Sequence, residues 1–170
     1  MSAARSLGHL LSENGIRLVY GGGNRGLMGT LADTVKSSGG NVLGVLPKAM
    51  DLPSVRTKDV ESELIIADDM HDRKRKMYDA ADAFVVLPGG IGTMDEFFEI
   101  FTWKQLGYHK KPVALLNVNG FYDTQLEFLD EAVEKGFVSK PMRDALIVLS
   151  GPEGLIEALE EHEGDLPSKL

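Results

Sequence analysis

Short apolar runs alternate along this chain with segments of helical periodicity, and this alternation constrains the fold more than any other feature. The runs are rich in Val, Ile and Leu and span residues 16–20, 42–46, 63–66, 83–87, 113–117 and 146–149. The helical patterns span residues 2–14, 27–38, 70–80, 93–106, 122–135 and 152–162. Strands that are apolar throughout and separated by helices are typical of a parallel sheet covered on both faces. The sequence therefore predicts an α/β fold with a doubly wound parallel sheet.

The expected helix ends and the chain length support this assignment. Gly39, Gly107, Gly136 and Gly151 stand where helices should end, and glycine commonly closes a helix. With 170 residues, 43% of them hydrophobic, the chain suits one Rossmann-like domain over residues 1–170. The chain opens on a helix, whereas a doubly wound sheet begins with a strand. We therefore expect the first strand to be missing from this chain.

Composition excludes several classes of function. The net charge of −8 opposes a broad surface for nucleic acid or an anionic membrane, while a small pocket for one phosphate remains compatible with it. The sequence contains no cysteine, which removes disulfides, thiolate metal sites and cysteine nucleophiles. The four histidines show no metal-ligand spacing, and no run of apolar residues is long enough for a membrane span. We expect a cytoplasmic protein whose partners are small anions.

A glycine turn follows the strand predicted at residues 83–87. Residues 88–96 read Pro-Gly-Gly-Ile-Gly-Thr-Met-Asp-Glu. Glycines let backbone N–H groups approach an anion, and the N-terminus of the following helix adds about half a positive charge. The segment therefore predicts a phosphate-binding turn, which we call the second glycine turn and which comprises Gly89, Gly90, Ile91, Gly92 and Thr93.

Glu96, at the end of this motif, has two interpretations. A carboxylate beside a bound phosphate costs binding energy unless it takes part in chemistry, which favours a catalytic role. Alternatively, Thr93 and Glu96 form a capping box, in which Glu96 bonds back to the Thr93 N–H. Both interpretations place Glu96 in the first turn of the helix.

An earlier glycine turn, residues 21–26, has the spacing G-x-G-x-x-G and follows the strand at 16–20. The next strand ends without the acidic residue that binds the ribose of a dinucleotide, which argues against a nicotinamide cofactor. The Lys and Ser/Thr of a nucleoside triphosphatase loop are also absent after it. Two interpretations remain open for this first glycine turn. It is either a tight turn with close helix packing, or a ribose or phosphate contact through Gly22 and Gly23.

The helix at residues 70–80 supplies cations. Spacing of 100° per residue puts Arg73 and Lys74 on the same face as Met70 and Met77. Cations on an apolar face require anions, so we expect both to meet a carboxylate, a phosphate or a ribose. In the helix at 93–106 we expect Thr102 to project in nearly the same direction as Glu96, or to bond back to the backbone.

The run Met70-His71-Asp72-Arg73-Lys74, paired with the motif at residues 88–96, resembles the Lonely Guy (LOG) family. Members of this family are cytokinin riboside 5'-monophosphate phosphoribohydrolases, earlier labelled possible lysine decarboxylases. The resemblance extends from about Leu7 to Phe137 and includes the first glycine turn. The loop at residues 49–59 departs from the acid-containing loop of the family.

The resemblance implies hydrolysis of the N-glycosidic bond of an N6-substituted AMP, giving the free base and ribose 5-phosphate without a cofactor. It places the essential arginine and glutamate of the family at Arg73 and Glu96. Lys74, residues 89–93 and Thr102 match positions that contact substrate. It also implies a homodimer or a higher homo-oligomer. The net charge of −8 argues against nucleic acid or a membrane as partner.

Other functions remain open on the same residues. A nucleotide nucleosidase with broader purine or pyrimidine specificity is the nearest alternative. A non-catalytic carrier of a nucleotide or of molybdenum cofactor shares the glycine turns, but it does not require an acid beside the phosphate. A lysine decarboxylase fits poorly, because no lysine has an evident pyridoxal phosphate setting.

Overall fold

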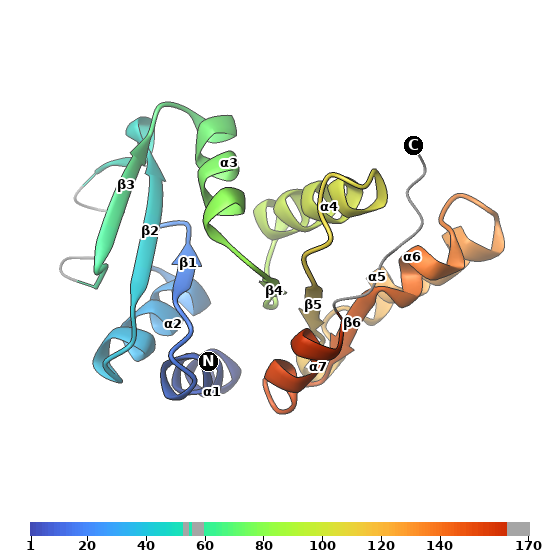
Figure 1. Ribbon diagram of the computed structural model, residues 1–170, viewed down its shortest axis with the longest axis horizontal. Helices are drawn as coiled ribbons and strands as arrows, with labels where there is room; N and C mark the ends of the chain where they lie inside the picture. The colour runs from blue at the N-terminus through green and yellow to red at the C-terminus, as the bar shows by residue number, and fades with distance from the viewer. Residues whose placement is uncertain (53–54, 56–59, 163–170) are drawn as a thin grey trace. The chain divides into compact units, whose positions relative to one another are not determined.

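A computed structural model describes residues 1–52, 55 and 60–162 of the chain. Its contacts divide the chain into two compact units, residues 1–81 and 82–170, and each is described by itself. Figure 1 shows the order of the elements in both units. The prediction of one domain over residues 1–170 stays a prediction.

The first unit is built around a parallel sheet of three strands. Its elements are α1 (Ser2–Glu13), β1 (Leu18–Tyr20), α2 (Gly26–Ser37), β2 (Val42–Pro47), the 3-10 turn η1 (Lys48–Met50), β3 (Glu63–Ala67) and α3 (Met70–Ala80). The strand order is β1-β2-β3, with Leu18 opposite Val42 and Leu43 opposite Glu63.

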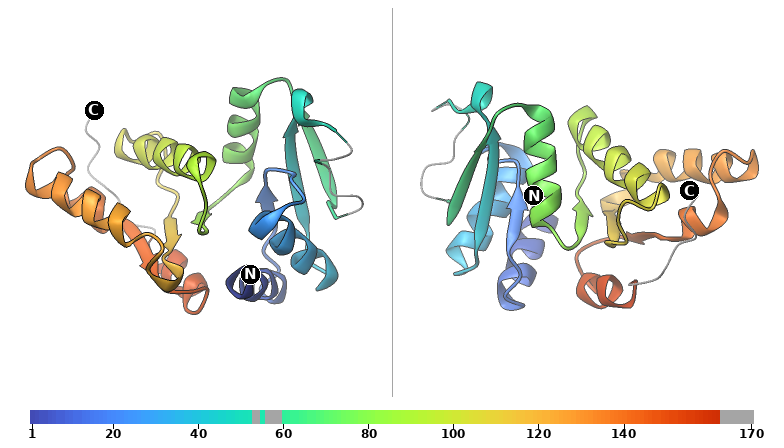
Figure 2. Two further views of the ribbon diagram at one scale, coloured as in Figure 1. Left: turned by 180° about the vertical axis from the view of Figure 1, so that it is seen from behind. Right: turned by 45° about the horizontal axis from the view of Figure 1, so that its top comes forward.

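Strand β2 is the centre of this unit, and all six of its residues are buried. Helix α2 packs on β1 and β2, and α1 packs against α2, as Figures 1 and 2 show. Helix α3 packs on β2 and β3, where Met77 contacts the cluster formed by Leu43, Val45 and Ala67. The central strand therefore supplies the fixed backbone against which α3 is placed.

The second unit contains another parallel sheet of three strands. Its elements are β4 (Phe84–Val86), α4 (Ile91–Gln105), β5 (Val113–Leu116), the 3-10 turn η2 (Val118–Gly120), α5 (Asp123–Glu134), α6 (Lys140–Asp144), β6 (Leu146–Leu149) and α7 (Leu155–Glu161). The strand order is β4-β5-β6, with Phe84 opposite Val113 and Val113 opposite Leu146.

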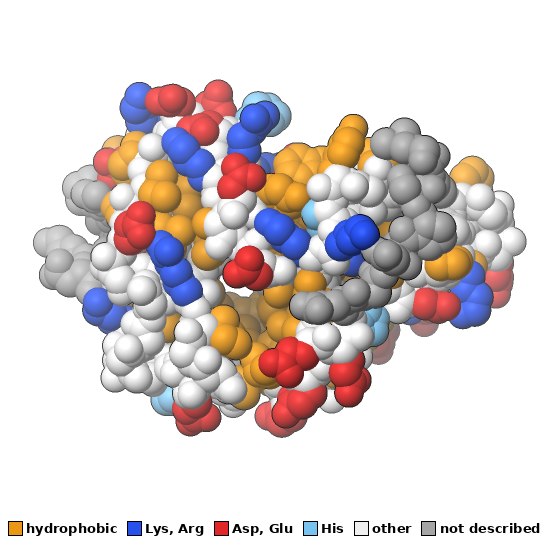
Figure 3. Space-filling model, in the orientation of Figure 1, with side chains coloured by type: hydrophobic (Ala, Val, Ile, Leu, Met, Phe, Trp, Pro, Cys, Tyr) orange, Lys and Arg blue, Asp and Glu red, His pale blue; other side chains and the backbone are white. Residues whose placement is uncertain are grey.

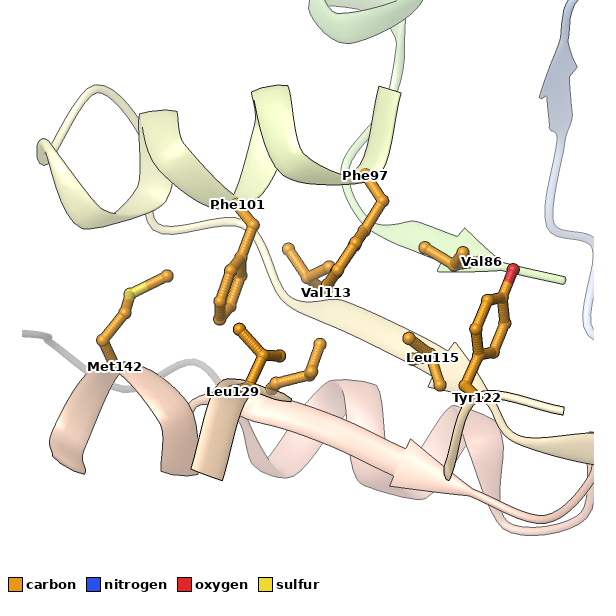
Figure 4. Packing of buried hydrophobic residues seen from close by; sticks show 9 residues of the cluster. Val86, Phe97, Phe101, Val113, Leu115, Tyr122, Leu129 and Met142 are labelled. Atoms are coloured by element: carbon orange, nitrogen blue, oxygen red, sulfur yellow. The ribbon is translucent and has the colours of Figure 1, made fainter. Parts of the chain in front are cut away.

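Both faces of β5 are covered, because all four of its residues are buried. Val113 and Leu115 join Phe97 and Phe101 of α4 and Leu129 of α5 in one cluster, which Figure 4 shows. Alternate side chains of a strand point to opposite faces, and α7 packs on β5 and β6. The second unit thus has helices on both sides of a parallel sheet.

The predicted α/β class with parallel strands is confirmed, and the strand and helix boundaries mostly agree within two residues. Gly39, Gly107 and Gly136 follow helix ends with positive φ, as expected for closing glycines. The expectation for Gly151 was wrong, because this residue follows β6. The short helix α6 was not predicted.

The structure does not test two of the expectations from the sequence. A first strand missing from the chain stays a prediction, since α1 is the first element described. The loop at residues 49–59 lies largely outside the described residues.

Candidate functional site

The second glycine turn connects β4 to α4 in the second unit. Helix α4 begins at Ile91, and its N-cap is Gly90, which has extended backbone angles (φ −94°, ψ −153°). No side-chain hydrogen bond caps this helix among the residues described. The first N–H groups of α4 therefore carry the partial positive charge of a helix N-terminus without a side-chain acceptor at the cap.

The capping-box interpretation of Glu96 is wrong, because α4 starts two residues earlier than predicted. Thr93 lies inside the first turn rather than at the N-cap, and half-buried Glu96 lies six positions after Gly90. A capping box requires the acid three residues after the cap. The helix start thus excludes the capping box as the role of Glu96.

The glycines of the second turn differ in the space around them. A Cβ at Gly89 would lie 2.7 Å from the Thr93 Cβ, so Thr93 occupies the place of a side chain there. A Cβ at Gly90 or Gly92 would meet no atom within 4 Å. The space beside these two residues is open, and a ligand can approach their backbone directly.

Arg73 lies in the first unit, whereas Glu96 lies in the second. Half-buried Arg73 projects from α3 toward the sheet, and its Nε donates to the Val45 carbonyl oxygen at 3.2 Å. A Cβ at Gly21 would collide with the Arg73 Nη2 and lie 3.2 Å from its Cζ. The guanidinium is thus held between a carbonyl of β2 and the Cα of Gly21.

The N-terminus of α3, unlike that of α4, is capped by side chains. The Asp69 carboxylate accepts from the Asp72 N–H at 2.8 Å, and the Asp72 carboxylate accepts from the Asp68 N–H at 2.9 Å. Lys76 also donates to Asp72 at 2.6 Å, and these contacts, that of Lys76 above all, lower the pKa of the Asp72 carboxyl. The caps fix the turn that carries Arg73 and half-buried Lys74.

Packing explains Gly22 and Gly23 of the first turn and Gly29 of α2, whereas Gly26 has φ +62° and open space beside it. Gly22 has φ +72°, and a Cβ there would lie 3.3 Å from the Leu46 Cβ. A Cβ at Gly23 would collide with the Met28 side chain, and one at Gly29 would lie 2.6 Å from the Asn24 carbonyl carbon. The structure thus accounts for Gly22, Gly23 and Gly29 by close packing. Substrate contact at Gly22 and Gly23 stays a prediction.

Thr102 does not project in the direction of Glu96, and that expectation was wrong. Six residues at about 100° each place the two side chains about 120° apart. Thr102 is exposed and lines a shallow groove along α4 with Ile91, Met94 and Phe98. Glu96 is not among the residues that line this groove.

This α4 groove has an exposed apolar character. Ile91 is 91% exposed and Phe98 is 37% exposed. In the space-filling view of Figure 3, hydrophobic side chains reach the surface along α4.

The end of α4 contains two buried titratable side chains. The Lys104 ammonium donates to the Lys110 and Lys111 carbonyl oxygens at 3.1 and 3.0 Å, and burial lowers its pKa. His109 bonds through Nε2 to the Ile100 carbonyl oxygen at 2.8 Å, and burial lowers its pKa. Both side chains thus join the loop that follows α4 to the helix itself.

The described part of the chain contains no group of three or more His, Cys, Asp or Glu side chains that could hold a metal ion. None of its helices is both long and apolar enough to cross a membrane.

The sequence did not predict the roles of two residues that shape the two glycine turns. Gly21 makes room for the Arg73 guanidinium, and the Tyr122 hydroxyl donates to the Leu87 carbonyl oxygen at 2.6 Å, just before the second glycine turn. The members of each pair are 52 and 35 residues apart in sequence, so no local pattern joins them. The glycine spacing pointed to Gly21 only as part of a turn.

The fold and the two turns define a Rossmann-like α/β protein. Comparison with solved structures agrees: the molybdenum cofactor binding protein of Rippkaea orientalis matches with a TM-score of 0.71 and 23% identity, over 94% of this chain and 85% of that one. The molybdenum cofactor carrier protein of Chlamydomonas reinhardtii matches with a TM-score of 0.68 and 21% identity, over 95% and 86%. At such identities the likeness concerns the fold alone.

Sequence comparison identifies the family. A family model described as possible lysine decarboxylase matches residues 28–159. Cytokinin riboside 5'-monophosphate phosphoribohydrolase LOG2 of Arabidopsis thaliana is 48% identical over 171 residues, covering 99% of this chain and 80% of the relative. The enzyme LOG of Oryza sativa subsp. japonica is also 48% identical, over 94% of this chain and 66% of its own length. The chain belongs to the LOG family, which confirms the resemblance seen in its two motifs.

Proposed function

We propose that this protein is an N-glycosyl hydrolase that cleaves an N6-substituted AMP, a cytokinin nucleotide, into the free base and ribose 5-phosphate. The observation that carries the proposal is the 48% identity to a phosphoribohydrolase over 99% of the chain. The glycine turns support it, since a nucleoside monophosphate offers the phosphate and ribose that such turns bind.

The reaction breaks the bond between C1' of the ribose and a nitrogen of the base. Positive charge develops on the ribose, and a carboxylate close to it stabilises that charge. We assign this role to Glu96, which activates the water or attacks C1' directly. The water oxygen becomes the C1' hydroxyl of ribose 5-phosphate, and a proton passes to the departing base.

The other proposed site residues bind and orient the nucleotide. Arg73, held by the Val45 carbonyl, orients the phosphoribosyl group or assists the departing base. Gly89, Gly90, Ile91, Gly92 and Thr93 present backbone N–H groups, and the open space at Gly90 and Gly92 supports this role. Gly22, Gly23, Lys74 and Thr102 are further proposed substrate contacts. No cofactor takes part in this scheme.

We propose in addition that the protein acts as a homodimer or higher homo-oligomer in the cytoplasm. The exposed apolar side chains of the α4 groove support self-association, because such patches commonly mark interaction surfaces. The absence of cysteine from the sequence suits a reducing compartment. Light scattering coupled to size-exclusion chromatography measures the oligomer size, and a monomer at micromolar concentration would contradict this part of the proposal.

A product assay tests the enzymatic function. The protein is incubated with N6-isopentenyl-AMP, AMP and N6-isopentenyladenosine, and free base and ribose 5-phosphate are quantified by liquid chromatography. We expect equal amounts of base and ribose 5-phosphate from N6-isopentenyl-AMP, and none from the nucleoside, which lacks the phosphate. Equal rates with AMP would indicate the broader nucleosidase. Tight nucleotide binding without any product would indicate a carrier.

A further inference from the structure

The side chain of Tyr122 lies beneath the end of β4, on the inner side of the second glycine turn. Tyr122 directly precedes α5 and is 0% exposed, so its ring is enclosed in the core of the second unit. Figure 4 shows the ring beside Leu115, with its hydroxyl oxygen near the end of the strand that carries Val86. A buried hydroxyl needs a hydrogen-bond partner, and the partner of Tyr122 shows which part of the backbone this side chain holds.

The partner of this hydroxyl lies directly before Pro88. The Tyr122 hydroxyl donates to the Leu87 carbonyl oxygen at 2.6 Å. Burial raises the pKa of the Tyr122 hydroxyl. The hydroxyl is therefore bonded to the residue directly before Pro88, where the second glycine turn begins.

Tyr122 is itself held in place by its neighbours. The Asn117 Oδ1 accepts from the Tyr122 N–H at 2.7 Å, and the Asn117 Nδ2 donates to Asp123 Oδ1 at 2.7 Å. Asn117 follows β5, the central strand of this sheet. The hydroxyl is thus tied to the most buried strand of the unit, and a displacement of the turn would require breaking this chain of bonds.

We propose that Tyr122 is a positioning residue for the nucleotide phosphate or ribose. By fixing the backbone at Leu87, directly before the turn, it sets the direction of the N–H groups from Gly90 to Gly92. The inference rests on the proposed function, because it assigns the second glycine turn to the ligand. Tyr122 itself has no contact with the nucleotide in this scheme. Its effect passes through the turn.

The variant Tyr122→Phe tests this role, because it removes the hydroxyl and keeps the ring. We expect KM for N6-isopentenyl-AMP to rise about tenfold while kcat changes much less, since a misplaced turn weakens binding. The matched control is Ser139→Ala, in the same unit. It removes the side-chain cap of α6, where Ser139 Oγ accepts from the Met142 N–H, and should lower stability without changing KM.

Amide hydrogen exchange provides a readout that does not depend on activity. In Tyr122→Phe, we expect exchange at Gly89 to become about tenfold faster relative to amides of α6, because the turn opens more often. Unchanged exchange there, or an unchanged KM in an active enzyme, would overturn the proposal. If the wild-type protein releases no base, the proposed function fails, and the Kd of ribose 5-phosphate measured by calorimetry replaces KM as the readout. A Kd unaffected by Tyr122→Phe also overturns the proposal.

Discussion

The two glycine turns share a position after a parallel strand, but their glycines serve different ends. In the first turn, side chains of the protein occupy the space beside Gly21, Gly22 and Gly23, and the Arg73 guanidinium lies against Gly21. In the second turn, Gly90 and Gly92 face open space. A glycine motif therefore carries two physical meanings, close packing by the protein itself or access for a ligand, and the surrounding atoms distinguish them.

The largest effect is expected at the packed turn, in a double-mutant cycle of Gly21→Ala and Arg73→Ala. Gly21→Ala should lower the free energy of unfolding by about 1 kcal/mol, because its methyl group displaces the guanidinium from its hydrogen bond to Val45. In the Arg73→Ala background the same change should cost much less, since the overlapping group is gone. Urea unfolding of all four proteins measures the coupling.

If the losses of unfolding free energy from Gly21→Ala and Arg73→Ala simply add, Gly21 does not serve to accommodate the Arg73 guanidinium, and the proposed difference between the two turns is contradicted. Gly8→Ala is a matched control, because its Cβ would lie 2.7 Å from the Thr34 Cβ, in the contact between α1 and α2. We expect Gly8→Ala to be equally destabilising in both backgrounds.

An effect of the opposite sign is expected at the open turn. Gly92 lies in the first turn of α4, where alanine is favoured over glycine by roughly 0.5–1 kcal/mol. Gly92→Ala should therefore raise the free energy of unfolding slightly, while KM for N6-isopentenyl-AMP rises on the order of tenfold because the methyl group occupies the ligand's space. A destabilised variant with wild-type KM would show that Gly92 serves packing after all.

The smallest effect is expected at the far end of α4, from pH. Burial depresses the pKa of His109 in the folded protein below its ordinary value of 6.5. The unfolded chain therefore binds this proton more readily, so stability is intact above pH 6.5 and falls as the pH drops below it. Lys104 and Lys111 oppose the charged form as well. Urea unfolding at pH 7.5 and 5.5 should show a larger loss in wild type than in His109→Gln.

Periodicity predicted much of the fold, because the elements bury their side chains in regular patterns. All residues of strands β2 and β5 are buried, as their unbroken apolar runs predict. The partial burial of Arg73 also followed from its place on the helix face. These features depend on neighbours along the chain, so the sequence displays them directly.

The errors and omissions arose where distant residues or small shifts decide the outcome. Helix α4 starts at Ile91 because Gly90 serves as its N-cap, and this shift of two residues removes the capping box. Thr102 was placed in the wrong direction by an error in the helical angle. Tyr122 was missed because its bond to Leu87 joins residues 35 apart. The sequence therefore located the turns but not the contacts that shape them.

The chemical role of Glu96 is the central claim, and Glu96→Gln tests it most directly, because the substitution removes the charge and keeps the shape. We predict that kcat for N6-isopentenyl-AMP falls by about a thousandfold. The neighbouring Asp95→Asn should change kcat little, and both variants should unfold close to the wild-type urea midpoint. Wild-type kcat in Glu96→Gln would contradict the account.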